Sequence, residues 1–132
     1  MTNFRFHKNE HLKNVSVIES IFSNGKSFAV YPIRILWVTK PLEDGHSPFQ
    51  ITISVPKRKF PKAVDRNRIK RQIREAYRLN KHLLFQKLEP NNTTQWAMVF
   101  LYTGKKNPNY TDIEQSIIGI LNRLKLGKKV KS

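Results

Sequence analysis

The clearest pattern along the chain is a long amphipathic segment that extends to Lys81. From position 63 to position 89 there is neither glycine nor proline, and residues that favour helices dominate. At 100° per residue, one side of this helix is apolar and carries Ile69, Ile73, Ala76, Tyr77, Leu83 and Leu84. The adjoining side carries Asn67, Lys70, Arg71, Arg74, Arg78 and Lys81. The pattern predicts a helix that packs one face on a core and presents a second, cationic face.

Two strands are predicted in the first half of the chain. The run from Tyr31 to Thr39 is rich in β-branched and aromatic residues, which favour strands. A short edge strand is predicted before it, at Ser27 and Phe28. Proline cannot donate a hydrogen bond to a neighbouring strand, so Pro32 predicts an edge position for the longer strand as well.

Two further strands flank the long helix. Turn-forming residues at positions 41–48 predict a hairpin, so that residues 49–55 return antiparallel to the preceding strand. The polar face of residues 49–55 is expected either to face water or to form the floor of a solvated cleft. Residues 96–102 are apolar on both faces, as in a central strand. Because the long helix connects residues 49–55 to residues 96–102, these two strands should run parallel.

Two shorter helices are predicted from their end signals. Capping boxes that begin at Ser16 and at Thr111 predict where each helix starts. Gly25 is expected to end the first helix in a left-handed cap, and Gly127 is expected to end the last.

These elements predict an α+β fold: a single-domain α/β sandwich over residues 1–132. Its sheet is expected to be mixed but mainly antiparallel, in the chain order α-β-β-β-α-β-α. Residues 1–14 are expected to form an extended arm, and residues 127–132 a mobile basic tail.

Charge narrows the class of partner. The chain has a net charge of +16 and a pI near 10.4, and residues 57–81 alone carry +9. Such a balance indicates nucleic acid or an anionic membrane surface. Membrane binding would require a helix with a free apolar face, whereas the core needs that face here. Cysteine is absent, which excludes disulfides and thiolate chemistry and is typical of a reducing cytoplasm.

The cationic helix face has two readings. Charged residues on a helix most often form a solvated face, but such faces usually mix signs because like charges at i,i+4 repel. Here the face is almost entirely cationic, and arginine, whose planar fork suits phosphate oxygens, outnumbers lysine. A polyanionic partner is the better explanation.

Residues 63–78, with the sequence AVDRNRIKRQIREAYR, closely resemble the Arg-Asn-Arg signature of the bacterial ribonuclease P protein. The elements before and after them also follow that family's order. The resemblance implies an RNA-binding domain that assists a catalytic RNA, which removes the 5′ leader of precursor tRNA with Mg²⁺ held mainly by the RNA. It also implies a left-handed βαβ crossover, although most such crossovers are right-handed. The residues implied to contact the catalytic RNA are Arg66, Asn67, Arg68, Lys70, Arg71, Arg74 and Arg78, and Asn67 is also a candidate for contact with metal-bound water.

The same resemblance implies a cleft for the single-stranded leader, walled by the first helix. The family commonly places two aromatic residues four positions apart on this helix, and the corresponding residues here are Ile18 and Phe22. Lys57 and Arg58 match the family's basic residues after the strand. Phe22 has a second reading as an ordinary core residue, because apolar residues at helical spacing are usually buried.

The sequence offers no catalytic constellation of its own. The four histidines lie in unrelated elements, no glycine-rich phosphate loop occurs, and the nine acidic residues are scattered. The expected partners are therefore the ribonuclease P RNA and precursor tRNA, with no membrane and no DNA. The alternative is a non-enzymatic RNA-binding protein of ribosomal-protein type, which the composition fits equally well. A DNA-binding helix-turn-helix ranks third, because it would leave the strands without a role.

Overall fold

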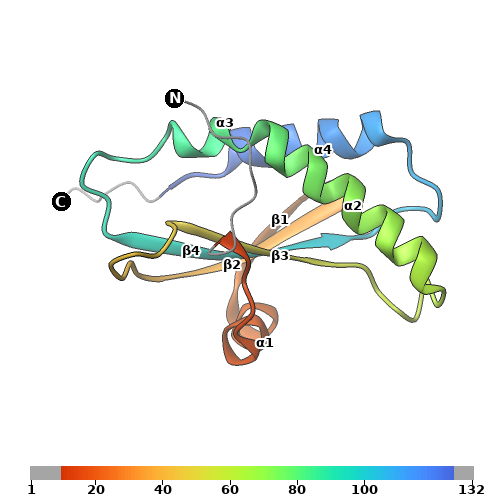
Figure 1. Ribbon diagram of the computed structural model, residues 1–132, viewed down its shortest axis with the longest axis horizontal. Helices are drawn as coiled ribbons and strands as arrows, with labels where there is room; N and C mark the ends of the chain where they lie inside the picture. Colours follow the sequence, from red (N-terminus) through yellow and green to blue (C-terminus); the bar gives the residue numbers. More distant parts are fainter. Residues whose placement is uncertain (1–9, 127–132) are drawn as a thin grey trace.

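The computed structural model describes residues 10–126, which form a four-stranded sheet with helices on both faces (Figure 1). The elements in chain order are α1 (Val15–Asn24), β1 (Lys26–Val30), β2 (Ile33–Pro41), β3 (Phe49–Ser54), α2 (Ala63–Asn80), α3 (His82–Phe85), β4 (Thr94–Tyr102) and α4 (Tyr110–Arg123). The sequence predicted α3 only as the end of the long helix, whose apolar side includes Leu83 and Leu84, and not as a separate helix. Residues 1–9 of the predicted arm, and the predicted basic tail at residues 127–132, lie outside the described residues.

The strand order of the sheet is β1-β2-β4-β3. Strands β1 and β2 are antiparallel, β2 and β4 are antiparallel, and β3 is parallel to β4 as predicted. The predicted hairpin between residues 31–39 and 49–55 is wrong, because β4 lies between β2 and β3. The apolar character of β4 explains this position: paired on both edges and covered on both faces, it is almost entirely buried. The hand of the crossover from β3 to β4 stays a prediction.

The edge position predicted from Pro32 is also wrong. Strand β2 is internal, with β1 on one side and β4 on the other. Pro32 precedes the strand, which begins at Ile33, so the missing N–H interrupts no ladder hydrogen bond. The Pro32 carbonyl accepts from the backbone N–H of Thr103 at 2.8 Å, which ties the β1–β2 turn to the end of β4.

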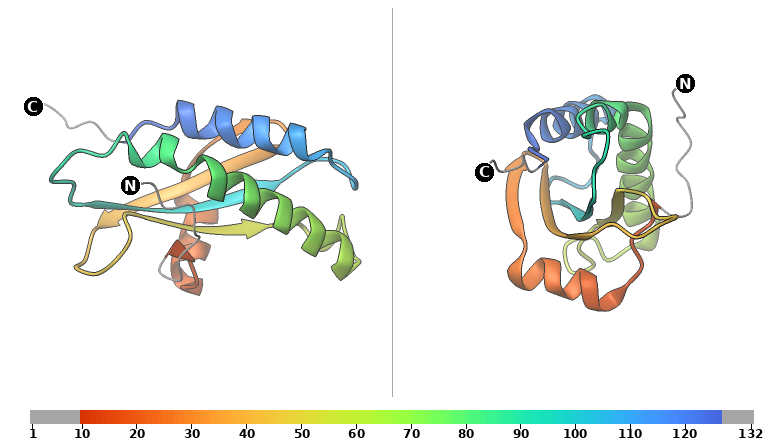
Figure 2. Two further views of the ribbon diagram at one scale, coloured as in Figure 1. Left: turned by 45° about the horizontal axis from the view of Figure 1, so that its top comes forward. Right: turned by 90° about the vertical axis from the view of Figure 1, so that its left-hand side faces the viewer.

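Helices cover the two faces of the sheet unequally (Figure 2). Helices α2, α3 and α4 pack on one face over the larger core, which includes Ile35, Phe49, Ile69, Tyr77, Met98, Phe100, Ile117 and Leu121. Helix α1 crosses the other face over a smaller cluster formed by Leu12, Ile21, Ala97 and Val99. The period-2 alternation of β2 therefore supplies both cores, with Ile35 on one side and Leu36 on the other.

Both capping-box predictions are wrong. The side chain of Asn14, not Ser16, accepts from the Val17 N–H at 3.1 Å and caps α1. Asn109, not Thr111, caps α4 by accepting from the Thr111 N–H at 2.9 Å. Asparagine is an equally good N-cap, and in both places it lies two residues before the start of the predicted box.

The C-terminal ends of the short helices also differ from expectation. Gly25 is extended, with φ −72° and ψ 157°, rather than left-handed. A glycine is still required, since a Cβ at this position would lie 2.4 Å from the Ile21 carbonyl oxygen. Helix α4 ends at Arg123, and the predicted cap Gly127 lies outside the described residues. The Lys87 ammonium instead donates to the carbonyls of Leu121 and Leu124, each at 2.6 Å.

The long helix is interrupted at Lys81, between α2 and α3. Lys81 is not part of the cationic face, because it is buried and its ammonium lies 2.9 Å from a carboxylate oxygen of Glu10, which is also buried. Beyond Glu10, the Leu12 N–H donates to the Ile51 carbonyl at 2.8 Å, so the segment runs along the free edge of β3. Among residues 10–126, no helix is both long enough and apolar enough to cross a bilayer.

Candidate nucleic-acid interface

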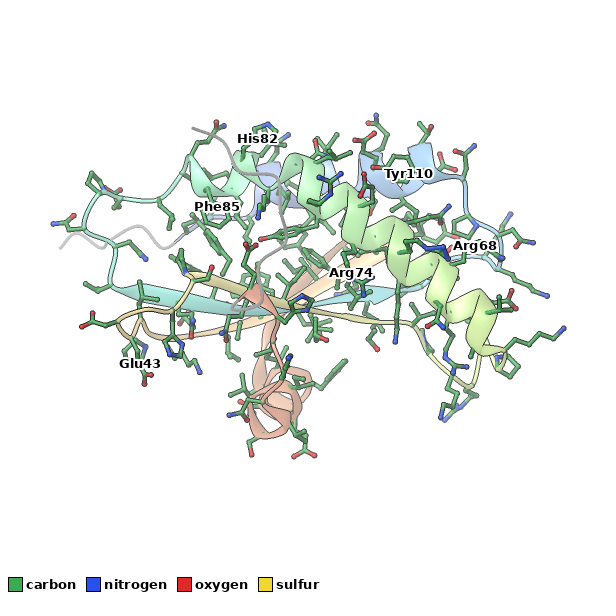
Figure 3. The ribbon with its side chains drawn as sticks, viewed as in Figure 1. Glu43, Arg68, Arg74, His82, Phe85 and Tyr110 are labelled. Atoms are coloured by element: carbon green, nitrogen blue, oxygen red, sulfur yellow. The ribbon has the colours of Figure 1, made fainter. Side chains whose placement is uncertain are left out.

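The outer face of α2 carries three cations without internal partners. Lys70, Arg71 and Arg74 project from the side of the helix that does not face the core, and Arg71 and Arg74 are exposed. Within residues 10–126, none of the three makes a hydrogen bond or an ion pair. Their neighbour Asn67 is exposed as well. Figure 3 shows Arg74 and Arg68 along the helix. This array is held in place by Ile69 and Ile73, which are fully buried on the opposite side.

Arg66 is bound to the chain that precedes its own helix. One terminal nitrogen of its guanidinium donates to the carbonyl oxygens of Phe60 and Pro61, each at 2.9 Å. These contacts fix the segment between β3 and α2 at the point where the helix begins. Because a guanidinium has five N–H donors, the remaining ones are still able to bind an anion.

Arg68 connects α2 to the β4–α4 loop. Its Nη2 lies 3.3 Å from Oδ1 of Asp65 and 2.6 Å from Oδ1 of Asn107. Asp65, which is buried, also lies 3.8 Å from the Lys106 ammonium. The helix dipole favours the negative charge of Asp65 in the first turn of α2, and that charge attracts Arg68 and Lys106. Arg68 is positioned by these contacts rather than extended freely into solvent.

Arg78 is paired within the helix. Its Nε and Nη2 donate to the two carboxylate oxygens of Glu75, at 3.1 Å and 2.7 Å. The hydrogen bond from Arg78 lowers the pKa of Glu75, so the carboxylate is charged at neutral pH. Because Glu75 offsets its charge, Arg78 is a weaker candidate for a phosphate contact than Arg71 or Arg74.

His11 borders the cationic array at the edge of β3. It forms a bridge with Ile51, and its ring lies close enough to Arg74 to sense that charge. Burial lowers the pKa of His11, and the charges of Arg74 and Lys13 lower it further. His11 is therefore neutral at pH 7 and adds no charge to the array.

Helix α1 presents an apolar flank that the sequence only partly predicted. Ile21 is fully buried against the sheet, whereas Phe22 is 48% exposed. Ile18 is half-buried in the smaller core. Val15, which is 67% exposed, lies three residues before Ile18 and seven before Phe22, so the three residues line the same flank. Val15 was not predicted on this flank, because the capping box placed the start of the first helix at Ser16.

The remaining predicted cleft residues lie on another element. Lys57 and Arg58 are exposed in the turn that follows β3. Helix α1 packs on β2 and β4, and β3 lies beyond β4. The polar side chains Gln50, Thr52 and Ser54 are half-buried on β3. The four predicted cleft residues therefore come from two elements: Ile18 and Phe22 from α1, and Lys57 and Arg58 from the turn after β3.

The described residues do not provide a metal site of their own. No three His, Asp or Glu side chains between residues 10 and 126 are close enough together to hold a cation. Asp65 is engaged by two cations, Glu75 by Arg78 and Glu10 by Lys81. Mg²⁺ prefers several oxygen ligands, mostly carboxylates and waters, so this donor set does not fit it.

A mixed α+β sheet that carries a helix with an exposed cationic face is typical of a nucleic-acid-binding protein. A model of the ribonuclease P family matches residues 6–125. The chain is 35% identical over 121 residues to the ribonuclease P protein component of Porphyromonas gingivalis, covering 92% of this chain and 87% of that protein. It is 32% identical to the corresponding protein of Clostridioides difficile, covering 89% and 94%.

Solved structures agree on the fold. The ribonuclease P protein from Thermotoga maritima superposes with a TM-score of 0.66 at 24% identity, covering 88% of this chain and 98% of that chain. The protein from Staphylococcus aureus superposes with a TM-score of 0.59 at 25% identity, covering 96% and 99%. The chain belongs to the ribonuclease P protein family. Its role is that of a protein subunit in tRNA 5′ processing.

Proposed function

We propose that this protein binds the catalytic RNA of ribonuclease P through α2 and thereby assists removal of the 5′ leader from precursor tRNA in the cytoplasm. The observation that carries the proposal is the array of Lys70, Arg71 and Arg74, which have no internal partners among the described residues. Unpaired cations on a rigid helix suit the phosphates of folded RNA, because binding breaks no internal ion pair and releases counterions from the RNA.

The proposed RNA contacts differ between residues that have no internal hydrogen bond and residues that already make one. Arg71, Arg74 and Lys70 contact phosphates directly, and Asn67 hydrogen-bonds to backbone, base or metal-bound water. Arg66 and Arg68 bind the RNA with the donors that their internal hydrogen bonds leave over. Arg78 contributes less, because Glu75 partly neutralises it. The whole chain acts as one RNA-binding domain.

The chemistry is assigned to the RNA partner. Because the described residues lack a carboxylate cluster, we assign Mg²⁺ to the RNA and no catalytic residue to the protein. The ribosomal-type alternative loses its support once the family is known, since the relatives in that family are named as ribonuclease P protein components. No membrane or DNA partner is proposed.

The leader is assigned to the surface beside α1. Single strands are held by aromatic stacking in a positively charged groove. Phe22 offers a half-exposed ring, Ile18 extends the apolar flank, and Lys57 and Arg58 supply exposed charge after β3. Because Ile18 stands where the family commonly has a second aromatic residue, we expect this helix to bind the leader weakly.

Phe22→Ala should weaken binding of precursor tRNA by the assembled holoenzyme and leave binding of mature tRNA unchanged. One stacked base is worth about 1–3 kcal/mol, and the loss should lie near 1 kcal/mol because Ile18 does not complete the platform. The measurement is a pair of equilibrium binding titrations with the two tRNAs.

The matched control is Phe22→Leu, which keeps apolar bulk on α1 but removes the ring. It should lose precursor affinity nearly as Phe22→Ala does, while its melting temperature stays near that of the native protein. If a folded Phe22→Ala variant lost affinity equally for precursor and mature tRNA, the leader assignment would be wrong.

A further inference from the structure

A concave site lies at the end of the sheet near the start of α2. It is a cavity of about 500 Å³ between the β1–β2 turn, the end of β4, the β4–α4 loop and the first turn of α4. Its lining includes Tyr31, Pro32, Tyr102, Asn107, Asn109 and Gln115. Figure 1 shows the β4–α4 loop at the same end of the molecule as the beginning of α2. The volume is within the range of small-ligand sites.

The walls of the cavity are fixed by hydrogen bonds. Both the backbone N–H and the hydroxyl of Thr103 donate to the Pro32 carbonyl, at 2.8 Å and 3.0 Å. The Tyr102 hydroxyl donates to the Lys105 carbonyl at 2.5 Å. Burial raises the pKa of Tyr102 to about 12, so the hydroxyl keeps its proton at neutral pH and remains a donor. The β4–α4 loop is therefore held against the end of the sheet.

Gly104 makes this close packing possible. A Cβ at this position would lie 2.5 Å from the Tyr102 hydroxyl oxygen and 2.7 Å from Cβ of Pro32. Any larger residue would push apart two walls of the cavity. The site therefore depends on a glycine at a place where no side chain fits, which is the mark of a shaped site rather than a loose surface hollow.

The lining combines an aromatic face with amide groups. Tyr31 is 68% exposed, an unusual state for a ring that no core contact requires. The side-chain oxygens of Asn107 and Asn109 already accept from Arg68 and from the Thr111 N–H. Their NH₂ groups are thereby left to donate to a ligand. Exposed Lys105 lines the cavity, as does the acidic Asp112, and Lys106 lies on the same loop, 3.8 Å from Asp65.

An exposed ring, amide donors and nearby cations match one unstacked nucleotide: the base stacks on the ring, its acceptor atoms meet the amides, and its phosphate meets a lysine. Arg68 joins the cavity to α2, because the Asn107 side chain that lines the cavity is the one it hydrogen-bonds. We propose that this cavity binds a single extruded base of the RNA that α2 binds. The inference rests on the proposed function, whose RNA it shares.

The test compares Tyr31→Ala with Tyr31→Phe, which keeps the ring. Binding of ribonuclease P RNA is measured as a function of salt. Tyr31→Ala should weaken binding by roughly 5- to 140-fold, the value of one stacked base, and should flatten the slope against log salt by no more than the single phosphate contact that the nucleotide makes with a lysine. Tyr31→Phe should bind like the native protein.

A second measurement does not depend on that RNA. Each nucleoside monophosphate is titrated into the native protein while the backbone amide resonances of residues 104–109 are followed by NMR. At least one nucleotide should shift them in the native protein but not in Tyr31→Ala, and ribose 5-phosphate should not. The inference is overturned if Tyr31→Ala binds the RNA like the native protein, if no nucleotide shifts the loop, or if ribose 5-phosphate shifts it equally. Failure of the native protein to bind the RNA would instead overturn the proposed function.

Discussion

Lys81→Met is expected to lower the free energy of unfolding by about 3–5 kcal/mol, the usual cost of breaking a buried ion pair by removing one partner. Glu10 is 3% exposed, and its carboxylate accepts from the Lys81 ammonium at 2.9 Å and 3.1 Å. Without that ammonium a charged group remains buried. Urea unfolding of the native and variant proteins measures the difference.

Two further variants test whether the loss of stability comes from the Glu10–Lys81 ion pair or from substitution of a lysine in general. The double variant Glu10→Gln with Lys81→Met removes both charges and should recover much of the loss, because the stranded carboxylate is what costs most. Lys106→Met removes an exposed lysine that lies 3.8 Å from Asp65, and should cost at most about 1 kcal/mol. A loss below 1 kcal/mol for Lys81→Met would show that the ion pair does not anchor the N-terminal segment.

The second large effect concerns RNA affinity. Arg71→Ala and Arg74→Ala should each reduce the slope of log affinity against log salt by about 0.7–0.9, and the double variant by about twice that amount. Each side chain lacks an internal partner within the described part of the chain, so it can neutralise one RNA phosphate and displace the counterion bound there. Filter binding at several salt concentrations measures the slope.

Two comparisons make this prediction specific. Arg78→Ala should change the slope less, because Glu75 already offsets the Arg78 charge. Arg123→Ala removes an exposed cation at the end of α4 that is not assigned to RNA, and should leave the slope unchanged. Equal effects at Arg71, Arg78 and Arg123 would indicate a general effect of net charge and no defined binding face.

Local sequence patterns predicted where the helices and strands lie better than they predicted which strands pair with each other. The buried face of α2, with Ile69 and Ile73, follows directly from helical periodicity, and the burial of β4 follows from its apolar composition. The pairing of β2 with β4 did not follow, because hairpin signals are local whereas the insertion of β4 joins segments more than fifty residues apart in the sequence. The local hairpin signal therefore predicted β3 as the neighbour of β2, whereas β4 lies between them.

The same limit applies to the candidate site. The sequence placed Arg71 and Arg74 on an exposed cationic face, which the structure confirms. It could not show that Lys81 is buried, since its partner Glu10 lies 71 residues away. It also could not show that Arg68 binds Asn107, which comes from a loop 39 residues further on. Charge patterns along one helix identify candidates, but tertiary partners decide which of them remain available.

The most direct measurement is a cleavage assay at low Mg²⁺ with precursor tRNA, a bacterial ribonuclease P RNA and this protein. The RNA with the protein should release the 5′ leader at a Mg²⁺ concentration at which the RNA alone is nearly inactive, because the protein's cations substitute for part of the counterion requirement. The protein alone should release none. Cleavage that is no faster with the protein than without it, or turnover by the protein without RNA, would contradict its assignment as the RNA-binding subunit of this enzyme.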